Sequence, residues 1–253
     1  MAIYLFDMRW IVLFVFTLFA SVSFPQESVI LEANIALQDK NFKKALDLYI
    51  SVENNHEGGA GMYQNMAIAS AGVGQDAHAI LYYEKALKYK PNDKNLQKDL
   101  SNIRKKNPLL DEPTGQMFPI RIFNNVAGIF TAGIWAMISI ILCFSGCFII
   151  LLNYPFRNFT RNVWISFITS CVLFLVTFLF AWYRNEQIYH NRGMIITASD
   201  IVLKKSPDAS SPDISDLPPG SKVYKKDQIA DWNLVITENG DSGWISALAA
   251  SKI

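Results

Sequence analysis

The chain has 253 residues, of which 51% are hydrophobic, and its formal net charge is +1 at pH 7. This near-neutral balance excludes a strongly basic surface and an acidic tail, so a nucleic-acid partner is not expected. The apolar residues are concentrated in three blocks, at residues 10–20, 126–152 and 163–183. Because the segments between them have an ordinary soluble composition, we expect a multi-domain chain built from small modules.

The first apolar block predicts a signal peptide over residues 1–23. Arg9 precedes the apolar run WIVLFVFTLFA, and the small residues Ser21 and Ser23 follow it, which is the order found in secretory signals. The run is too short to cross a hydrocarbon core of about 30 Å comfortably as a helix. Asp7 weakens the positive region, so an uncleaved anchor stays an alternative. We expect the segment that follows to be exported.

Residues 26–106 carry a repeated pattern. Under a shift of 34 residues, the stretch LYYEKALKYKPND (81–93) falls on DLYISVENNHEGG (47–59), and Ala79 and Tyr83 align with Ala45 and Tyr49. A helix–turn–helix period of 34 residues is typical of tetratricopeptide repeats. We therefore predict an all-α repeat pair at 26–59 and 60–93. Pro91 would end the last helix, and a polar capping helix is expected at about residues 92–106.

The inner helices of such an array line a concave face that can bind peptides. The repeat pattern directs Asn34, Gln38 and Gln64 to this face and places Glu27 near its edge. Polar amides suit recognition of an extended peptide backbone, and a solvated helix face without a ligand is an equally good interpretation. A clamp for a peptide carboxylate is not supported, because these helices carry no cluster of Lys or Arg.

A linker is expected at residues 107–125, followed by two transmembrane helices at 126–152 and 163–183. Neither span contains a charged residue, and each is long enough to cross a bilayer. The short loop at 153–162 forces the two helices into a hairpin. Arginines flank both ends of the hairpin, so charge bias alone does not orient it. If the first domain is exported, the loop is cytoplasmic and both soluble domains lie in the periplasm, at the bacterial inner membrane.

The three cysteines all lie in these spans. Cys143 and Cys147 share one helix face with Ser139, and Cys171 lies in the second span. Two thiols without a nearby His or Asp make a poor metal site, so we expect this face to pack against a second helix through small residues. Since the exported segments contain no cysteine, no disulfide is expected in them.

Residues 193–253 predict a small all-β barrel of the SH3 type. GMIITASDIVLKKSP has the alternation of strands, a loop of Ser, Pro and Asp follows, and a Gly turn separates DWNLVIT from GWIS. Tyr224, Trp232 and Trp244 are candidates for a ligand-binding surface, because aromatic grooves bind extended peptides. The competing interpretation, common in such small barrels, is that the two tryptophans close the core.

The sequence predicts a protein that is not an enzyme and that uses no cofactor or metal. His56, His78 and His190 have no partner at metal-ligand spacing, and the sequence contains no GxSxG elbow and no P-loop. The stretch AGVGQDA lacks the third glycine of a dinucleotide fingerprint. The spans also lack the central charges that mark transport or intramembrane proteolysis.

The order of these modules, together with NFKKALDLY, YYEKALKYKPND, LPPGSKV and DSGWIS, resembles the BatE family of Bat aerotolerance operons over essentially the whole chain. The resemblance implies an inner-membrane component that acts beside von Willebrand A-type membrane proteins and a MoxR-type ATPase, and it supplies no catalytic residues. We expect a scaffold whose periplasmic repeats bind other Bat envelope proteins in a stress-related complex. The alternative is a protein that binds or senses peptidoglycan through its SH3-type domain.

Overall fold

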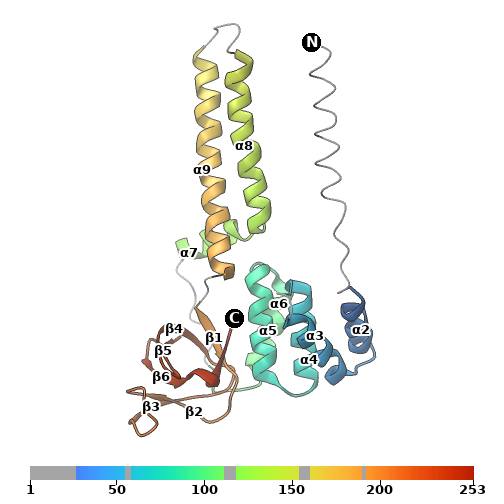
Figure 1. Cartoon of the computed structure of the whole chain (residues 1–253), viewed down its shortest axis with the longest axis vertical. Coiled ribbons are helices and arrows are strands. Elements are labelled where there is room, and N and C mark those ends of the chain that lie inside the picture. Colours follow the sequence, from blue (N-terminus) through green and yellow to red (C-terminus); the bar gives the residue numbers. More distant parts are fainter. Residues whose placement is uncertain (1–26, 55–57, 111–117, 154–159, 190–191) are drawn as a thin grey trace. The chain divides into compact units, whose positions relative to one another are not determined.

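A computed structural model of the chain describes residues 27–54, 58–110, 118–153, 160–189 and 192–253. Over these residues the chain forms eight α-helices and a seven-stranded sheet (Figure 1). It divides into two compact units, one before Gly58 and one from Gly58 to Ile253. The predicted combination of helices with an all-β part is confirmed. The expected signal peptide at 1–23 lies outside the described residues.

Two helical pairs precede the apolar helices in the chain. α2 (Glu27–Gln38) packs on α3 (Phe42–Glu53), and α4 (Ala60–Gly72) packs on α5 (Asp76–Tyr89). Small side chains allow the helices of a pair to approach closely. These side chains recur after 34 positions, because the alanines with no exposed surface include Ala33, Ala45, Ala67 and Ala79.

The turns inside the two pairs have the same geometry. Lys40 and Gly74, which are 34 positions apart, have φ angles of 58° and 80°. The next amide then donates to the carbonyl five residues earlier, from Asn41 at 2.8 Å and from Gln75 at 2.9 Å. This is the usual way in which a left-handed residue satisfies the last carbonyls of a helix. Each pair therefore closes its turn by the same local mechanism.

The segment after the second pair contains two further helices. α6 (Lys94–Arg104) lies where a capping helix is expected, and the Asp93 side chain accepts hydrogen bonds from two amides of its first turn, at 3.0 and 3.3 Å. α7 (Phe118–Ala127) lies largely within the stretch predicted as a linker. Pro119 in its first turn is compatible with a helix, since the amide of that position needs no intrahelical partner.

α8 (Ala132–Asn153) and α9 (Arg161–Tyr189) run side by side in opposite directions (Figure 1). Both are long and apolar enough to cross a membrane, by length and composition. Only 17% and 11% of their most apolar windows are buried, unlike the core helices of soluble proteins. α8 begins six residues later than the predicted span, because the Thr131 hydroxyl accepts from the Ile134 amide at 3.4 Å and starts a new helix there.

The two ends of the hairpin that connect to the rest of the chain lie together. The Tyr183 hydroxyl near the end of α9 donates to Asn124 Oδ1 on α7 at 2.6 Å, and its ring contacts Phe123 with centroids 4.9 Å apart. Trp135 in the first turn of α8 donates from Nε1 to the carbonyl of Ala127 at 3.0 Å. The chain therefore enters α8 and leaves α9 at the same end of the hairpin.

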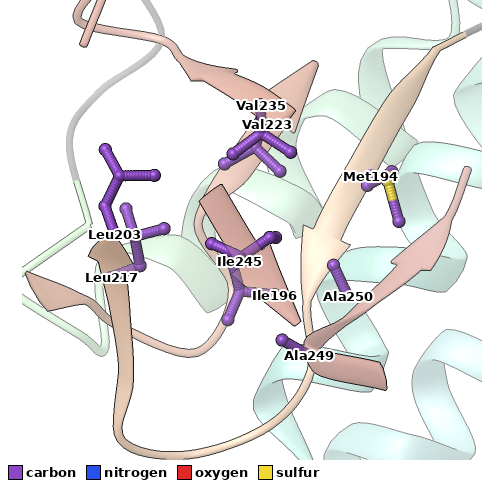
Figure 2. Close-up of a cluster of buried hydrophobic side chains, with 9 residues drawn as sticks. All are labelled: Met194, Ile196, Leu203, Leu217, Val223, Val235, Ile245, Ala249 and Ala250. Carbon is purple, nitrogen blue, oxygen red and sulfur yellow. The ribbon is translucent and has the colours of Figure 1, made fainter. Parts of the chain in front are cut away.

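The last sixty residues form one antiparallel sheet with the strand order β3-β2-β6-β5-β4-β1-β7. Its strands are β1 (Gly193–Ile196), β2 (Ile201–Lys204), β3 (Asp213–Leu217), β4 (Lys222–Ile229), β5 (Trp232–Thr237), β6 (Ser242–Ser246) and β7 (Ala250–Lys252). Leu217 from one edge strand and Ala250 from the other belong to the same buried cluster (Figure 2). The sheet therefore curls around a single core, as expected for a small module of this kind.

Two strands were not predicted from the sequence. β3 lies in the stretch of Ser, Pro and Asp that was predicted as a loop, and only Leu217 of its residues is buried. It therefore lacks the apolar alternation that marks a strand, and its pairing with β2 is what orders it. β7 follows a short 3-10 turn (Ala247–Ala249) after the strand that was expected to be the last, and it pairs with β1.

Candidate functional site

The predicted peptide-binding residues of the helical pairs lie in different environments. Asn34 on α2 is half-buried, and its Oδ1 accepts a 2.5 Å hydrogen bond from the Tyr49 hydroxyl of α3. Its oxygen thus contributes to packing within the first pair. Gln38 is exposed at the end of α2, and Gln64 is half-buried on α4. Glu27 is the first residue of α2, and its side chain lies outside the described part.

An apolar stripe on α2 was not identified from the sequence. Leu31 and Ile35 lie one turn apart and are 60% and 50% exposed. Gln38 continues the same side of the helix, because residues three and four positions apart are neighbours on a helix surface. The signal that could have identified this stripe is the i, i+4 spacing of two large aliphatic residues on a helix whose buried positions are alanines. It is a candidate contact surface of the first pair.

The two tryptophans of the sheet lie on the face opposite its core. On β5, Val235 is buried and the alternating residues Trp232 and Leu234 are half-buried. On β6, Ile245 is buried and its neighbour Trp244 is half-buried. Neither tryptophan belongs to the core cluster (Figure 2). The interpretation that the tryptophans close the core is therefore wrong.

Further apolar side chains share this outer face. Trp244 pairs with Leu234 across β5 and β6, and Trp232 pairs with Ile229 across β4 and β5. Tyr224 pairs with Ile236, and both Tyr224 and Ile229 are exposed. Paired residues of neighbouring strands point to the same side of a sheet. We call this surface the aromatic face; it consists of Tyr224, Ile229, Trp232, Leu234, Ile236 and Trp244.

α5 contacts the sheet through charged side chains spaced one turn apart. Glu84 Oε2 accepts a hydrogen bond from Lys222 Nζ of β4 at 2.6 Å. One turn further along, Lys88 Nζ donates to the main-chain oxygen of Ile253 at 3.0 Å. Glu84 also contacts Arg104 of α6, with Oε1 and Nη2 2.9 Å apart. One carboxylate thus joins two helices and a strand.

Glu238 completes a buried ionic network with these side chains. Its Oε2 lies 3.6 Å from Nη1 of Arg104, and the side chains of Glu84, Arg104, Lys222 and Glu238 are only 9–17% exposed. Burial would lower the pKa of Lys222, but the charge of Glu84, with smaller effects of Tyr224 and Glu238, raises it above the ordinary value. Burial raises the pKa of Glu238, and Arg104 and Lys222 oppose this rise only in part.

A cavity of about 970 Å³ lies next to this network. It is bounded by α5, α6, α7, the end of α9 and β4. Four cationic and two acidic side chains line it, together with amides and two tyrosines. The lining includes Glu84, Lys88, Lys94, Asn124, Tyr183, Arg184, Glu186, Gln187, Lys222 and Tyr224. A concave site with this lining can bind a polar or anionic ligand.

The histidines and cysteines do not assemble into a site in the part of the chain that the structure describes. No group of three His, Cys, Asp or Glu side chains there could hold a metal ion. Burial lowers the pKa of His78 on α5, whereas His56 and His190 lie outside the described residues.

The packing of the hairpin differs from the predicted stripe of small residues. Cys143 and Cys147 are exposed, and of that stripe only Ser139 is buried. The helices meet instead at Ser145 and Ser170, whose hydroxyl oxygens are 3.1 Å apart.

Comparisons of the chain with protein-family models, with curated proteins and with solved structures give no match. Its function is therefore inferred from the geometry of its own residues, together with the resemblance of its modules described above.

Proposed function

We propose that this protein is a non-enzymatic scaffold anchored in the bacterial inner membrane. The observation that carries the proposal is the hairpin of α8 and α9. Its apolar surface is exposed, and its two connected ends both contact α7, through Trp135 and Tyr183. If this hairpin spans a bilayer, the helical pairs and the sheet lie on the same side. With the signal peptide predicted at residues 1–23, that side is the periplasm.

The helical pairs act in this proposal as tetratricopeptide repeats that bind other envelope proteins. Support comes from the turns at Lys40 and Gly74, which recur after 34 positions with the same hydrogen bonds. The stripe formed by Leu31 and Ile35 adds exposed apolar surface of the kind that partners cover. The resemblance to the BatE family suggests that the partners are von Willebrand A-type membrane proteins of a Bat complex.

A second candidate function is favoured by the aromatic face. In this alternative the sheet is an SH3-type module that binds peptidoglycan, with Trp232, Trp244 and Tyr224 in contact with the ligand. Their position on the outer face leaves the rings available for stacking, which core residues cannot offer. Under this alternative the helical pairs are not required for binding to the cell wall.

Labelling of single cysteines tests the membrane arrangement. In a form with Cys143, Cys147 and Cys171 replaced by alanine, a cysteine is introduced at Asn102, at Asp200 or at Thr160, all of which are exposed. A membrane-impermeant maleimide should label intact spheroplasts at the first two positions and should label the third only after lysis. Labelling of Asn102→Cys and Asp200→Cys from opposite sides would refute the arrangement.

Capture from native membranes in mild detergent distinguishes the two functions. The Leu31→Ser, Ile35→Ser double variant should lose a von Willebrand A-type partner that the unchanged protein retains. Leu248→Ser is the matched control, since Leu248 is highly exposed on the sheet part. If the double variant retains the partner, while Trp232→Ala and Trp244→Ala abolish sedimentation with purified sacculi, the scaffold proposal is wrong and the cell-wall function is right.

A further inference from the structure

The cavity next to the α5–sheet contact contains a buried cation that forms no ion pair with the residues that the structure describes. Arg184 is 2% exposed. Its Nη1 donates to Gln187 Oε1 at 2.8 Å, and its Nη2 donates to the carbonyls of Lys88 and Tyr89 at 3.0 and 3.3 Å. In the part of the chain that the structure describes, its Nε has no hydrogen-bond partner. The positive charge of Arg184 is thus held by neutral oxygens, some of them at the C-terminus of α5.

The remaining charges of the cavity do not compensate this cation. Lys88, Lys94 and Lys222 add three positive charges to its lining, and Glu84 and Glu186 supply two negative ones. The side chains of the lining therefore carry a surplus of two positive charges. Glu84 already contacts both Lys222 and Arg104. Because a buried charge is costly unless an opposite charge is near, an anionic ligand would stabilise this arrangement.

The position of Arg184 in α9 indicates where such an anion would come from. The apolar run of α9 ends with Trp182 and Tyr183, of which Trp182 is exposed, and Arg184 follows directly. Tryptophan and tyrosine at the end of a spanning helix mark the depth of the lipid headgroups. Tyr183 also lines the cavity, and its hydroxyl accepts from Gln187 Nε2 at 2.8 Å. Cavity and headgroups would therefore lie at the same level.

We propose that this cavity binds the phosphate of an anionic membrane lipid, with Arg184 as the principal counter-charge and Lys94 as a second one at the rim. The cavity volume, about 970 Å³, is ample for a headgroup. Basic pockets beside membrane helices bind phosphorylated headgroups by the same electrostatics. This inference depends on the membrane placement proposed above, which the cysteine labelling tests independently.

Native mass spectrometry of the full-length protein in mild detergent measures this binding. The protein is titrated with short-chain phosphatidylglycerol, with phosphatidylcholine of the same chain length, and with inorganic phosphate. Phosphatidylglycerol should bind more tightly than phosphatidylcholine. Arg184→Gln and Lys94→Gln should each weaken binding of phosphatidylglycerol about fivefold. Lys94 is exposed, so its variant keeps the test valid if Arg184→Gln disturbs folding.

Arg161→Gln is the matched control, because Arg161 is exposed at the other end of α9. This variant should bind phosphatidylglycerol as tightly as the unchanged protein. If inorganic phosphate competes while the two lipids bind equally, the ligand is a soluble phosphate and the lipid assignment is wrong. If Lys94→Gln has no effect, or if Arg161→Gln weakens binding as much as Arg184→Gln, the cavity is not the binding site. The mass spectrometry needs no bilayer. A negative result would therefore refute the lipid site without bearing on the membrane arrangement, which the cysteine labelling tests.

Discussion

Lys222 Nζ lies 2.6 Å from Glu84 Oε2, although the two residues are 138 positions apart in the chain. This contact connects β4 to α5, and Arg104 extends it to α6. The second helical pair and the sheet therefore share a buried ionic network. Removal of residues 58–106 would delete Glu84 and Arg104 and leave Lys222 of the sheet without its carboxylate partner. Removal of residues 26–57 would leave the network intact, because it follows the boundary between the two compact units.

Loss of the Lys222 charge should destabilise the fold strongly. Lys222→Met leaves the Glu84 carboxylate without one of its two cations in a site that is only 12% exposed. We expect the free energy of unfolding to fall by about 2–3 kcal/mol. Urea denaturation of the full-length protein in detergent measures it. Lys106→Met is the control, because its pair with Asp76 is 52% and 40% exposed and should contribute less than about 1 kcal/mol. Equal losses for both variants would contradict this prediction.

Because of Glu238, the fold should be more stable at mildly acidic pH than at neutral pH. Burial raises its pKa in the folded state, so the folded protein binds the proton more tightly than the unfolded chain. Its contribution is fully present below the unfolded pKa of about 4.3 and is lost as the pH rises through the folded pKa. Tm measured from pH 4 to 8 should therefore fall more with pH for the unchanged protein than for Glu238→Gln. Parallel curves would show that Glu238 has an ordinary pKa.

Two glycines with the same backbone conformation should respond differently to alanine. Gly220 and Gly240 have φ angles of 94° and 95°, and Ala at either position pays the cost of a left-handed residue, about 1 kcal/mol. A Cβ at Gly220 would lie 2.7 Å from Cδ1 of Ile80 on α5, whereas a Cβ at Gly240 meets no atom within 4 Å. Gly220→Ala should therefore lower Tm further than Gly240→Ala. Equal shifts would show that α5 does not press on Gly220.

Replacing two neighbouring residues of β6 by alanine should destabilise the fold to different extents, and the smaller residue should contribute more to stability. Ile245 is buried in the core and Trp244 lies on the aromatic face. Ile245→Ala should cost about 2–5 kcal/mol, as for other large aliphatic core residues, and Trp244→Ala should cost less. Chemical denaturation of the two variants gives the order. A greater loss for Trp244→Ala would place this tryptophan in the core after all.

Tyr49 and Tyr83 occupy equivalent positions in the two helical pairs, but their hydroxyl groups should contribute differently to the free energy of unfolding. Tyr49→Phe removes the hydrogen bond to Asn34 and should cost about 1 kcal/mol. Tyr83→Phe should cost less, because in the described part of the chain no hydrogen bond of the Tyr83 hydroxyl is found. Thermal denaturation followed by the helical circular dichroism signal compares them. An equal effect of both variants would mean that Asn34 does not hold Tyr49.

Local patterns in the sequence determined the helices, the apolar spans and most of the strands. The 34-residue offset is visible in the sequence because small and aromatic residues recur at packing positions such as Ala45 and Ala79. Strand alternation is equally local, and it separates the residues of β5 into two sets. α7, β3 and β7 were missed: α7 is short and lies mostly in the stretch predicted as a linker, β3 has one buried residue, and β7 has three residues and follows the strand that was expected to be the last.

Tertiary structure decided which set of strand residues faces the core and which side chains meet. Alternation places Trp232 and Val235 on opposite faces but does not say which face closes the core; the smaller aliphatic residues fill it, and the tryptophans lie outside. The cavity around Arg184 and the pairing of Glu84 with Lys222 join segments that are far apart in the chain. Such contacts depend on how the folded elements pack against one another, so the local periodicity of the sequence does not predict them.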